Sequence, residues 1–376
     1  MVGAIGADSL SDWSLSHLLD EVWLRARRVL IRRLDLAGYW IGKAEYQDFL
    51  DGQRAIGAHL RDEWLAEALG SADSLCLQSE RAFRAANVRV RSRIPLIMAF
   101  GHGLGDGLAR LIADDPLPRT AGLCALFNLG ISFFDAVVDQ PAALRSALAQ
   151  HFDGHVLQNL AAEPDAARRH GEVFGQVEDD EIRILLKIVA AFFRELHSLY
   201  AAAGSQPSPR MAALLEQAYL AELSSTQDGG APRASDPTRT AELKSTLPFV
   251  IIGQIALAGV PCAPASAAAG VDRLAAELGG VFWLVDDLAD LATDARSGSL
   301  NAVLLRAGLS PELSRDSTAL RRGMGDLLDG LVIEDTAADV VTRLASVDRV
   351  LASFARDESA GRLRQIVRCY VRSWIT

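Results

Sequence analysis

The sequence contains few cysteines and lacks a basic leader at its start. Four cysteines occur among 376 residues, and the spacing of Cys76, Cys124, Cys262 and Cys369 matches no disulfide framework or metal-binding motif. The first residues, MVGAIGADSLSD, have no basic n-region of the kind that opens a secretory signal. We therefore expect a reduced, cytoplasmic protein.

Positive charge is also in short supply. The chain has 38 Lys and Arg residues against 48 Asp and Glu residues, which gives a formal net charge of −10. Nucleic-acid-binding domains usually carry the opposite balance, because they must offset phosphate charge. The composition thus argues against nucleic acid as a partner.

No apolar run is long enough to predict a transmembrane helix. The strongest one, residues 247–260, lies between Pro248 and Pro261, which we expect to bound it at about a dozen residues. A bilayer span needs about 20 apolar residues. We expect a core helix here and no stable membrane insertion.

Strict alternation of polar and apolar residues is likewise absent over any length that would predict a strand. Apolar residues recur instead at helical spacing, for example over residues 13–36, 182–203 and 363–375. With 50% hydrophobic residues, the chain can bury a large core. The sequence predicts an all-α protein organised as one domain over residues 1–376.

A column of carboxylates marks residues 279–301, GGVFWLVDDLADLATDARSGSLN. Asp286, Asp290 and Asp294 recur at i, i+4 and i+8, so they drift by only about 40° per step on a helix. Asp287 stands beside the first of them. The opposite face is apolar and should pack into protein; it carries Val281, Leu284, Leu288 and Leu291.

Carboxylates this close raise one another's pKa unless cations neutralise them, and hard oxygen ligands suit Mg²⁺. The alternative is a solvated acidic helix face, the common reason for a charge run. Two observations count against it. The segment before the column is uninterrupted apolar sequence, and a second carboxylate pair, Asp135 and Asp139, stands four apart on another apolar segment, residues 127–139.

These motifs resemble those of the class I isoprenoid synthases, and the second half of the chain is most similar to the trans-prenyltransferase branch. Segment 286–290, DDLAD, matches the second DDxxD motif of that branch. Lys244, in KSTLPF, is similar to its lysine-threonine segment. The pair Asp135 and Asp139 stands where the first DDxxD belongs, with Ala136 in place of the second aspartate. The resemblance covers about residues 90–305, and two motifs plus the lysine, in this order, make it specific.

The resemblance implies a barrel of antiparallel helices around an apolar central cavity. Residues 86–376 would form this catalytic barrel, with residues 1–85 as extra helices packed on it. Three Mg²⁺ ions would hold a prenyl diphosphate between the two aspartate motifs, whose ligand set is Asp135, Asp139, Asp286, Asp287, Asp290 and Asp294. Lys244 would donate to the diphosphate. The family's later lysine is missing at Gly298-Ser299, so we expect Arg296 to supply that charge.

Below the metals, the resemblance implies a dry pocket for the allylic cation. Phe134, Phe249, Phe282 or Trp283 could stabilise that cation through their ring faces, although each also fits plain core packing. Gly130 and Ile131 stand at positions whose bulk sets pocket depth in the relatives. Gly130 leaves room, so we expect geranylgeranyl diphosphate ahead of farnesyl diphosphate; the alternative is that Gly130 only allows close helix packing.

Two basic clusters that bind the second diphosphate in chain-elongating relatives are degraded here. Arg89, Arg91 and Arg93 fall out of register with the first cluster, and residues 140–145, QPAALR, lack the second. The sequence therefore favours a class I terpene synthase (cyclase) acting on one prenyl diphosphate. A trans-prenyltransferase using isopentenyl diphosphate and a non-catalytic partner subunit remain alternatives. The assembly state stays open, with a homodimer among the options.

Overall fold

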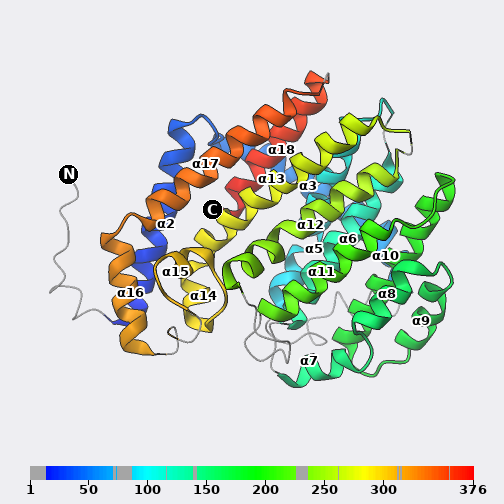
Figure 1. The fold of residues 1–376 in the computed structure, drawn as a ribbon, viewed down its shortest axis with the longest axis horizontal. Coiled ribbons are helices and arrows are strands. Elements are labelled where there is room, and N and C mark those ends of the chain that lie inside the picture. The colour runs from blue at the N-terminus through cyan, green and yellow to red at the C-terminus, as the bar shows by residue number, and fades with distance from the viewer. Residues whose placement is uncertain are drawn as a thin grey trace.

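Every regular element of the described chain is a helix (Figure 1). The structure is a computed structural model that describes residues 14–70, 73, 87–115, 117–138, 142–225, 236–260, 262–310, 313, 316–354 and 356–376. The all-α expectation is confirmed for these residues.

The helices follow one another with short connections. Their bounds are α2 (Leu15–Leu36), α3 (Lys43–Leu60), the π-helical turn η1 (Arg61–Leu65), α5 (Asn87–Arg110), α6 (Pro118–Val138), α7 (Ala142–Ala149), α8 (Gly154–Ala162), α9 (Ala166–Phe174), α10 (Asp180–Ala202), α11 (Pro209–Ser225), α12 (Pro237–Ala258), α13 (Ala265–Ala289), α14 (Leu291–Ser297), α15 (Ala302–Arg306), α16 (Ser317–Asp329), α17 (Val332–Leu351) and α18 (Asp357–Ile375).

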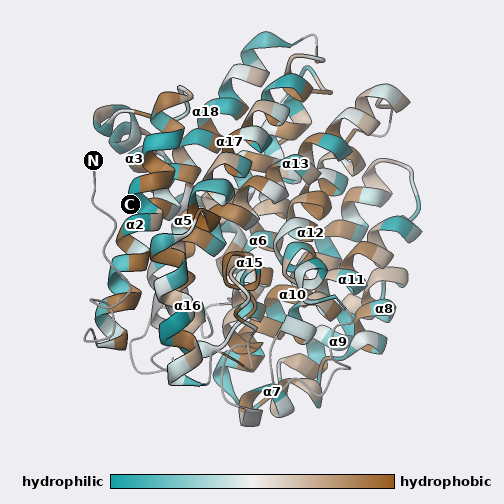
Figure 2. Ribbon diagram, turned by 60° about the vertical axis from the view of Figure 1, so that its left-hand side comes forward, coloured by the Kyte–Doolittle hydropathy of each residue, from teal (hydrophilic) through white to brown (hydrophobic). Residues whose placement is uncertain are grey.

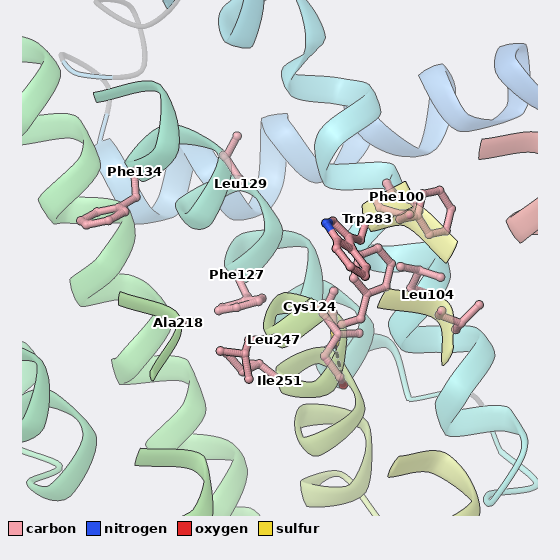
Figure 3. Packing of buried hydrophobic residues seen from close by; sticks show 14 of the residues in the cluster. Phe100, Leu104, Cys124, Phe127, Leu129, Phe134, Ala218, Leu247, Ile251 and Trp283 are labelled. Carbon is pink, nitrogen blue, oxygen red and sulfur yellow. Dashed lines mark hydrogen bonds between the residues drawn. The ribbon is translucent and has the colours of Figure 1, made fainter. Parts of the chain in front are cut away.

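The long helices α17, α13, α12 and α11 lie side by side in that order, and α5 and α6 pack against α12 (Figure 1). In Figure 2 the long helices carry hydrophobic and hydrophilic turns next to each other, as amphipathic helices do. The α5–α6 contact is close because Gly101 has no side chain. A Cβ there would come within 2.4 Å of the Cys124 carbonyl oxygen, and Cys124 itself lies in the core (Figure 3).

The N-terminal helices pack on the rest of the chain rather than apart from it. Helix α2 contacts α13, α14, α16 and α17, and α3 contacts α5 and α18. The inner side of α2 is apolar at helical spacing, with Leu18, Val22 and Leu30 almost fully buried. This packing places α2 directly against the helices that carry the aspartate column.

The expectation that Pro248 bounds an apolar helix is wrong, because α12 runs through it from Pro237 to Ala258. Proline in a helix interior removes one donor, here toward the carbonyl of Lys244, and packing on neighbouring helices holds the chain helical despite that loss. Helices α6 and α12 consequently have the length and composition of a membrane span, with mean hydropathy of 1.8 and 1.3 in their most apolar windows. The α6 window is 72% buried within the protein, as in a soluble core helix.

The single helix expected over residues 279–301 is also interrupted. Helix α13 ends at Ala289, and Asp290 leaves helical geometry with φ −96° and ψ 6° before α14 begins. The i to i−4 backbone hydrogen bonds nevertheless continue through the break, at 2.8 Å for both Asp290 to Asp286 and Asp294 to Asp290. Gly298 then ends α14 in the left-handed conformation, with φ +69°. The register of the aspartates is therefore nearly that of one helix.

Helix α3 meets α5 at Gly57, which gives a test of the packing. A Cβ at Gly57 would lie 1.9 Å from the carbonyl oxygen of Pro95, which is backbone and cannot move aside. We expect Gly57→Ala to lower the free energy of unfolding by about 1–3 kcal/mol. Gly52→Ala, in the same helix with nothing within 4 Å of its Cβ, should raise it by roughly 0.5–1 kcal/mol. Urea unfolding of both variants measures this, and equal effects would contradict the close contact.

Candidate active site

Lys244 joins carboxylates from two other helices. Its Nζ lies 2.7 Å from Asp135 Oδ1 on α6 and 3.3 Å from Glu222 Oε2 on α11. Glu222 is only 3% exposed, whereas the Asp135 side chain is 40% exposed. A buried carboxylate needs such a partner, because an uncompensated charge in the interior is costly. The ammonium group thus ties α6, α11 and α12 together at one point, called here the lysine triad.

The aspartate column lies on α13, α14 and the residue between them. Asp286 Oδ1 accepts a hydrogen bond from Trp374 Nε1 on α18 at 2.8 Å. Asp290 is exposed, and Asp294 Oδ2 accepts from Asn301 Nδ2 at 2.8 Å. Two of the three carboxylates are therefore held by neutral donors, which fix their orientation without cancelling their charge.

Electrostatics show that the column and the triad face each other. Burial raises the pKa of Asp286 to about 7, and the charges of Asp290 and Asp135 add to the rise. Burial likewise raises the pKa of Asp294 to about 7, with contributions from the other two column carboxylates. The Lys244 ammonium opposes both shifts. Since Asp135 and Lys244 belong to the triad, both groups form one acidic site.

Asp287 has a separate, structural role that the sequence did not indicate. It is 6% exposed, and its Oδ2 accepts a hydrogen bond from the backbone N–H of Ala302 at 2.7 Å. Its own carbonyl accepts from Asn301 Nδ2 at 2.8 Å, and Asn301 is fully buried at the start of α15. Burial raises the Asp287 pKa well above its usual value. These bonds attach α15 to the end of α13.

The remaining predicted charged residues are placed as follows. Arg296 lies on α14, about half exposed, with Nη2 at 3.4 Å from Asp20 Oδ1. Arg93 is exposed on α5. Asp139 lies outside the described residues, and so do the side chains of Arg89 and Arg91.

An apolar cavity of about 70 Å³ lies among α6, α8, α10 and α11. Its lining includes Gly130, Ile131, Phe134, Ile188, Ala218 and Tyr219. Asp135 follows Ile131 by four residues, and Glu222 follows Ala218 by four. Positions four apart share a helix face, so both walls of the cavity lead in one turn to carboxylates of the lysine triad.

Gly130 contributes to this cavity rather than to a tight helix contact. A Cβ at Gly130 would meet only Ile188 Cγ2, at an ordinary van der Waals distance of 3.5 Å. Of the two interpretations open at this position, the close-packing one has no steric basis in this structure.

The predicted aromatic residues are divided between two places. Phe134 lines the cavity and packs against Tyr219, whereas Phe249 and Phe282 stack on each other with ring centres 5.1 Å apart. The second pair belongs to a buried aromatic cluster beneath Asp286, which also contains Phe100, Tyr370 and Trp374. Trp283 lies next to Arg343 instead. Figure 3 shows Phe134 well apart from Phe100 and Trp283.

The site has the chemistry of a divalent-cation site without being assembled as one. Among the described residues, no group of three or more Asp, Glu, His or Cys side chains stands close enough to hold a metal ion. The donors are nevertheless hard carboxylate oxygens, and the pKa of about 7 at Asp286 and Asp294 reports negative charge that lacks compensation. Both properties suit Mg²⁺, which binds through carboxylates and offsets their repulsion.

Neither a comparison with protein-family models nor one with curated proteins finds a match for this chain. Function therefore has to be inferred from the chemistry of the site itself.

Sequence reasoning missed Glu222 and Trp374. Glu222 lies one and two helical turns beyond Ala218 and Leu215, both buried, and that spacing is a signal that it faces the interior. Trp374 was placed on the apolar stripe of the last helix, which is correct. No sequence signal shows that its indole N–H reaches a carboxylate 88 residues away.

The raised pKa values predict a specific pH dependence. A carboxyl group whose pKa is raised by folding stabilises the fold in its protonated form, and that contribution is lost as the pH rises from about 4 to about 7. We expect Asp286→Asn, measured with EDTA, to be more stable than the wild type at pH 8 by about 1–2 kcal/mol and nearly equal to it at pH 5. Thermal unfolding at the two pH values measures the difference.

Asp48→Asn, an exposed position on α3, is the matched control and should show no such change between pH 5 and pH 8. The same gap between Asp286→Asn and wild type at both pH values would contradict the raised pKa.

Proposed function

We propose that the protein is a class I terpene synthase of the isoprenoid synthase fold, which ionises a prenyl diphosphate and cyclises the resulting carbocation. The observation that carries the proposal is the pairing of an acidic column with a lysine triad directly above an apolar cavity. An anionic head group needs cations and donors, and its hydrocarbon tail needs an apolar wall. This site brings the elements for both within one helical turn of each other.

Asp286, Asp290, Asp294 and Asp135 are the residues that would hold Mg²⁺, with Asp139 as the predicted second ligand from α6. We leave Asp287 out of the set, because its carboxylate is engaged with the backbone of Ala302. Bound Mg²⁺ would supply positive charge that stabilises the departing diphosphate. Hydrogen bonds from Trp374 and Asn301 keep Asp286 and Asp294 oriented toward the site.

Lys244 has two tasks in this proposal. In the structure its ammonium neutralises Asp135 and Glu222. When a diphosphate enters, Lys244 donates to the phosphate oxygens instead, which stabilises charge on the leaving group during ionisation. Asp135 is then free to serve as a ligand. Glu222 stays buried and keeps the lysine charged and in place, so we add it to the site as a positioning residue.

The hydrocarbon chain would occupy the cavity beneath the triad, where the faces of Phe134 and Tyr219 can stabilise a carbocation. At about 70 Å³ the cavity is smaller than the roughly 300–1,000 Å³ of typical ligand pockets. A prenyl chain therefore enters only if side chains lining α10 and α11 move. We keep geranylgeranyl diphosphate as the favoured substrate, ahead of farnesyl diphosphate, because Gly130 leaves room at the depth position.

Purified protein with Mg²⁺ and single prenyl diphosphates tests the function. Hydrocarbon or alcohol formed from one substrate supports a cyclase. Longer diphosphates formed only with isopentenyl diphosphate would replace this proposal by a trans-prenyltransferase, and no turnover with any substrate would overturn both enzymatic functions. Activity must also disappear in excess EDTA, and full activity there would contradict the metal assignment.

Variants of the triad sharpen that test. We expect Lys244→Ala to lower kcat/KM by about 100-fold or more, as loss of a charged donor to a leaving group does, and Lys244→Arg to retain part of the activity. Asp135→Asn and Asp286→Asn should each abolish turnover while thermal unfolding stays cooperative. Lys43→Ala, an exposed lysine on α3, is the control and should leave activity unchanged. Normal turnover by Lys244→Ala would remove the triad from the mechanism.

Chain-length preference is tested at the cavity. Gly130→Phe places a ring into the cavity and should shift preference from geranylgeranyl toward geranyl or farnesyl diphosphate. Ile188→Ala removes the side chain that faces Gly130 and should favour the longest substrate. Ile188 is fully buried, so its truncation costs about 2–5 kcal/mol, and assays should run well below its melting temperature. Unchanged relative kcat/KM in both variants would place the hydrocarbon chain elsewhere.

A further inference from the structure

A second, larger hollow lies on other faces of the helices that carry the site. It has a volume of about 680 Å³, within the range of ligand pockets, and is bordered by α11, α12, α13 and α17. Helix α12 contributes Glu242, Thr246 and Val250, whereas Lys244 points well away from this row at 100° per residue. The same rotation separates Glu277 from Asp286 on α13. This hollow, called here the arginine groove, is thus distinct from the candidate active site.

The arginine groove is basic although the protein is acidic. Its charged lining consists of Arg239, Arg273, Arg343, Arg349, Glu242 and Glu277. Four positive and two negative side chains give a net charge of +2, in a chain whose formal net charge is −10. A concave surface with locally inverted charge attracts anions.

Arg343 is held as a donor at the base of the groove. Its guanidinium lies 5.9 Å from the centre of the Trp283 ring, and Gly280 makes the space for it, since a Cβ there would come within 2.0 Å of Nη1. Glu242 and Glu277 are each 3.9 Å away, too far for a hydrogen bond. In the described part of the chain the Arg343 guanidinium makes no hydrogen bond. Its planar donors are therefore fixed in position and available to an anion.

The rim and the floor complete the site. Arg273 and Arg349 are exposed and make no ion pair with any described residue. Between the charges the floor is apolar, with Leu214, Leu243, Leu247, Val250 and Val350. Inorganic anions alone would leave this floor in water, whereas an attached apolar chain would cover it and gain about 25 cal/mol per Å² buried.

We propose that the arginine groove binds one small amphiphilic anion, a phosphate or carboxylate that carries a short apolar chain. Arg343 and the two rim arginines hold the anionic head, and the leucine and valine floor covers the chain. Binding here does not require the terpene synthase activity, because the groove shares no side chain with the lysine triad or the aspartate column.

Isothermal titration of the full-length protein in EDTA, with octyl phosphate as the probe, tests this assignment. We expect saturable one-to-one binding, and about tenfold weaker binding or less by the double variant Arg273→Gln/Arg349→Gln. Both positions are exposed, so the variant should keep its fold, as circular dichroism will show. Arg168→Gln, an exposed arginine on α9, is the matched control and should bind like the wild type. Asp286→Asn should also bind normally, which separates this site from the active site.

Comparison probes decide the chemistry of the ligand. Inorganic phosphate and 1-octanol should each bind at least tenfold more weakly than octyl phosphate, because each lacks one half of the recognised molecule. Octanoate should bind in the same concentration range as octyl phosphate. Equal binding of inorganic phosphate would reduce the groove to an unspecific anion site, and absence of binding, or equal loss in the Arg168→Gln control, would overturn the proposal.

Discussion

The crowding of carboxylates at the end of an apolar helix bundle is the constraint on which the site depends. Asp286 and Asp294 are pushed toward neutrality by burial and by each other, and Lys244 is the cation that moderates both. Such a cluster lowers stability, so the surrounding helices must offset it by packing. The aromatic cluster beneath Asp286 does this, and Trp374 belongs to the cluster and to the site at once. Stability and charge placement are coupled through that one indole ring.

Helical periodicity explains what the sequence could predict. The apolar back of the aspartate helix, including Val281, Leu284 and Leu288, is buried as its spacing indicates. The absence of any period-two segment gave the all-α class for the same reason, because periodicity along the chain encodes which faces are covered. The spacing of Asp286, Asp290 and Asp294 also survives a break in the helix, since the backbone hydrogen bonds keep their register across it.

What the sequence could not predict depends on neighbours distant along the chain. Pro248 reads locally as a helix boundary, but contacts with α11 and α13 keep α12 helical on both sides of it. Asp287 stands next to Asp286 in the motif, yet a rotation of 100° turns it toward Ala302 and into a structural bond. Pairing of Lys244 with Glu222 joins two helices whose proximity no local pattern contains. A motif fixes residue types and spacing, while partners follow from the packing.

Helices α12 and α13 separate opposite charges across their own thickness. One side carries Lys244 and the aspartate column, and the other borders the arginine groove. A helix is about 10 Å wide, and at an effective dielectric constant of about 20 two unit charges at that distance interact by roughly 1–2 kcal/mol. The groove arginines therefore favour ionised aspartates on the far side, and cations held there favour an anion in the groove. Because coupling between two sites is reciprocal, occupation of either one strengthens binding at the other. Two faces of one helix pair are enough for this linkage, and no movement of the backbone is required.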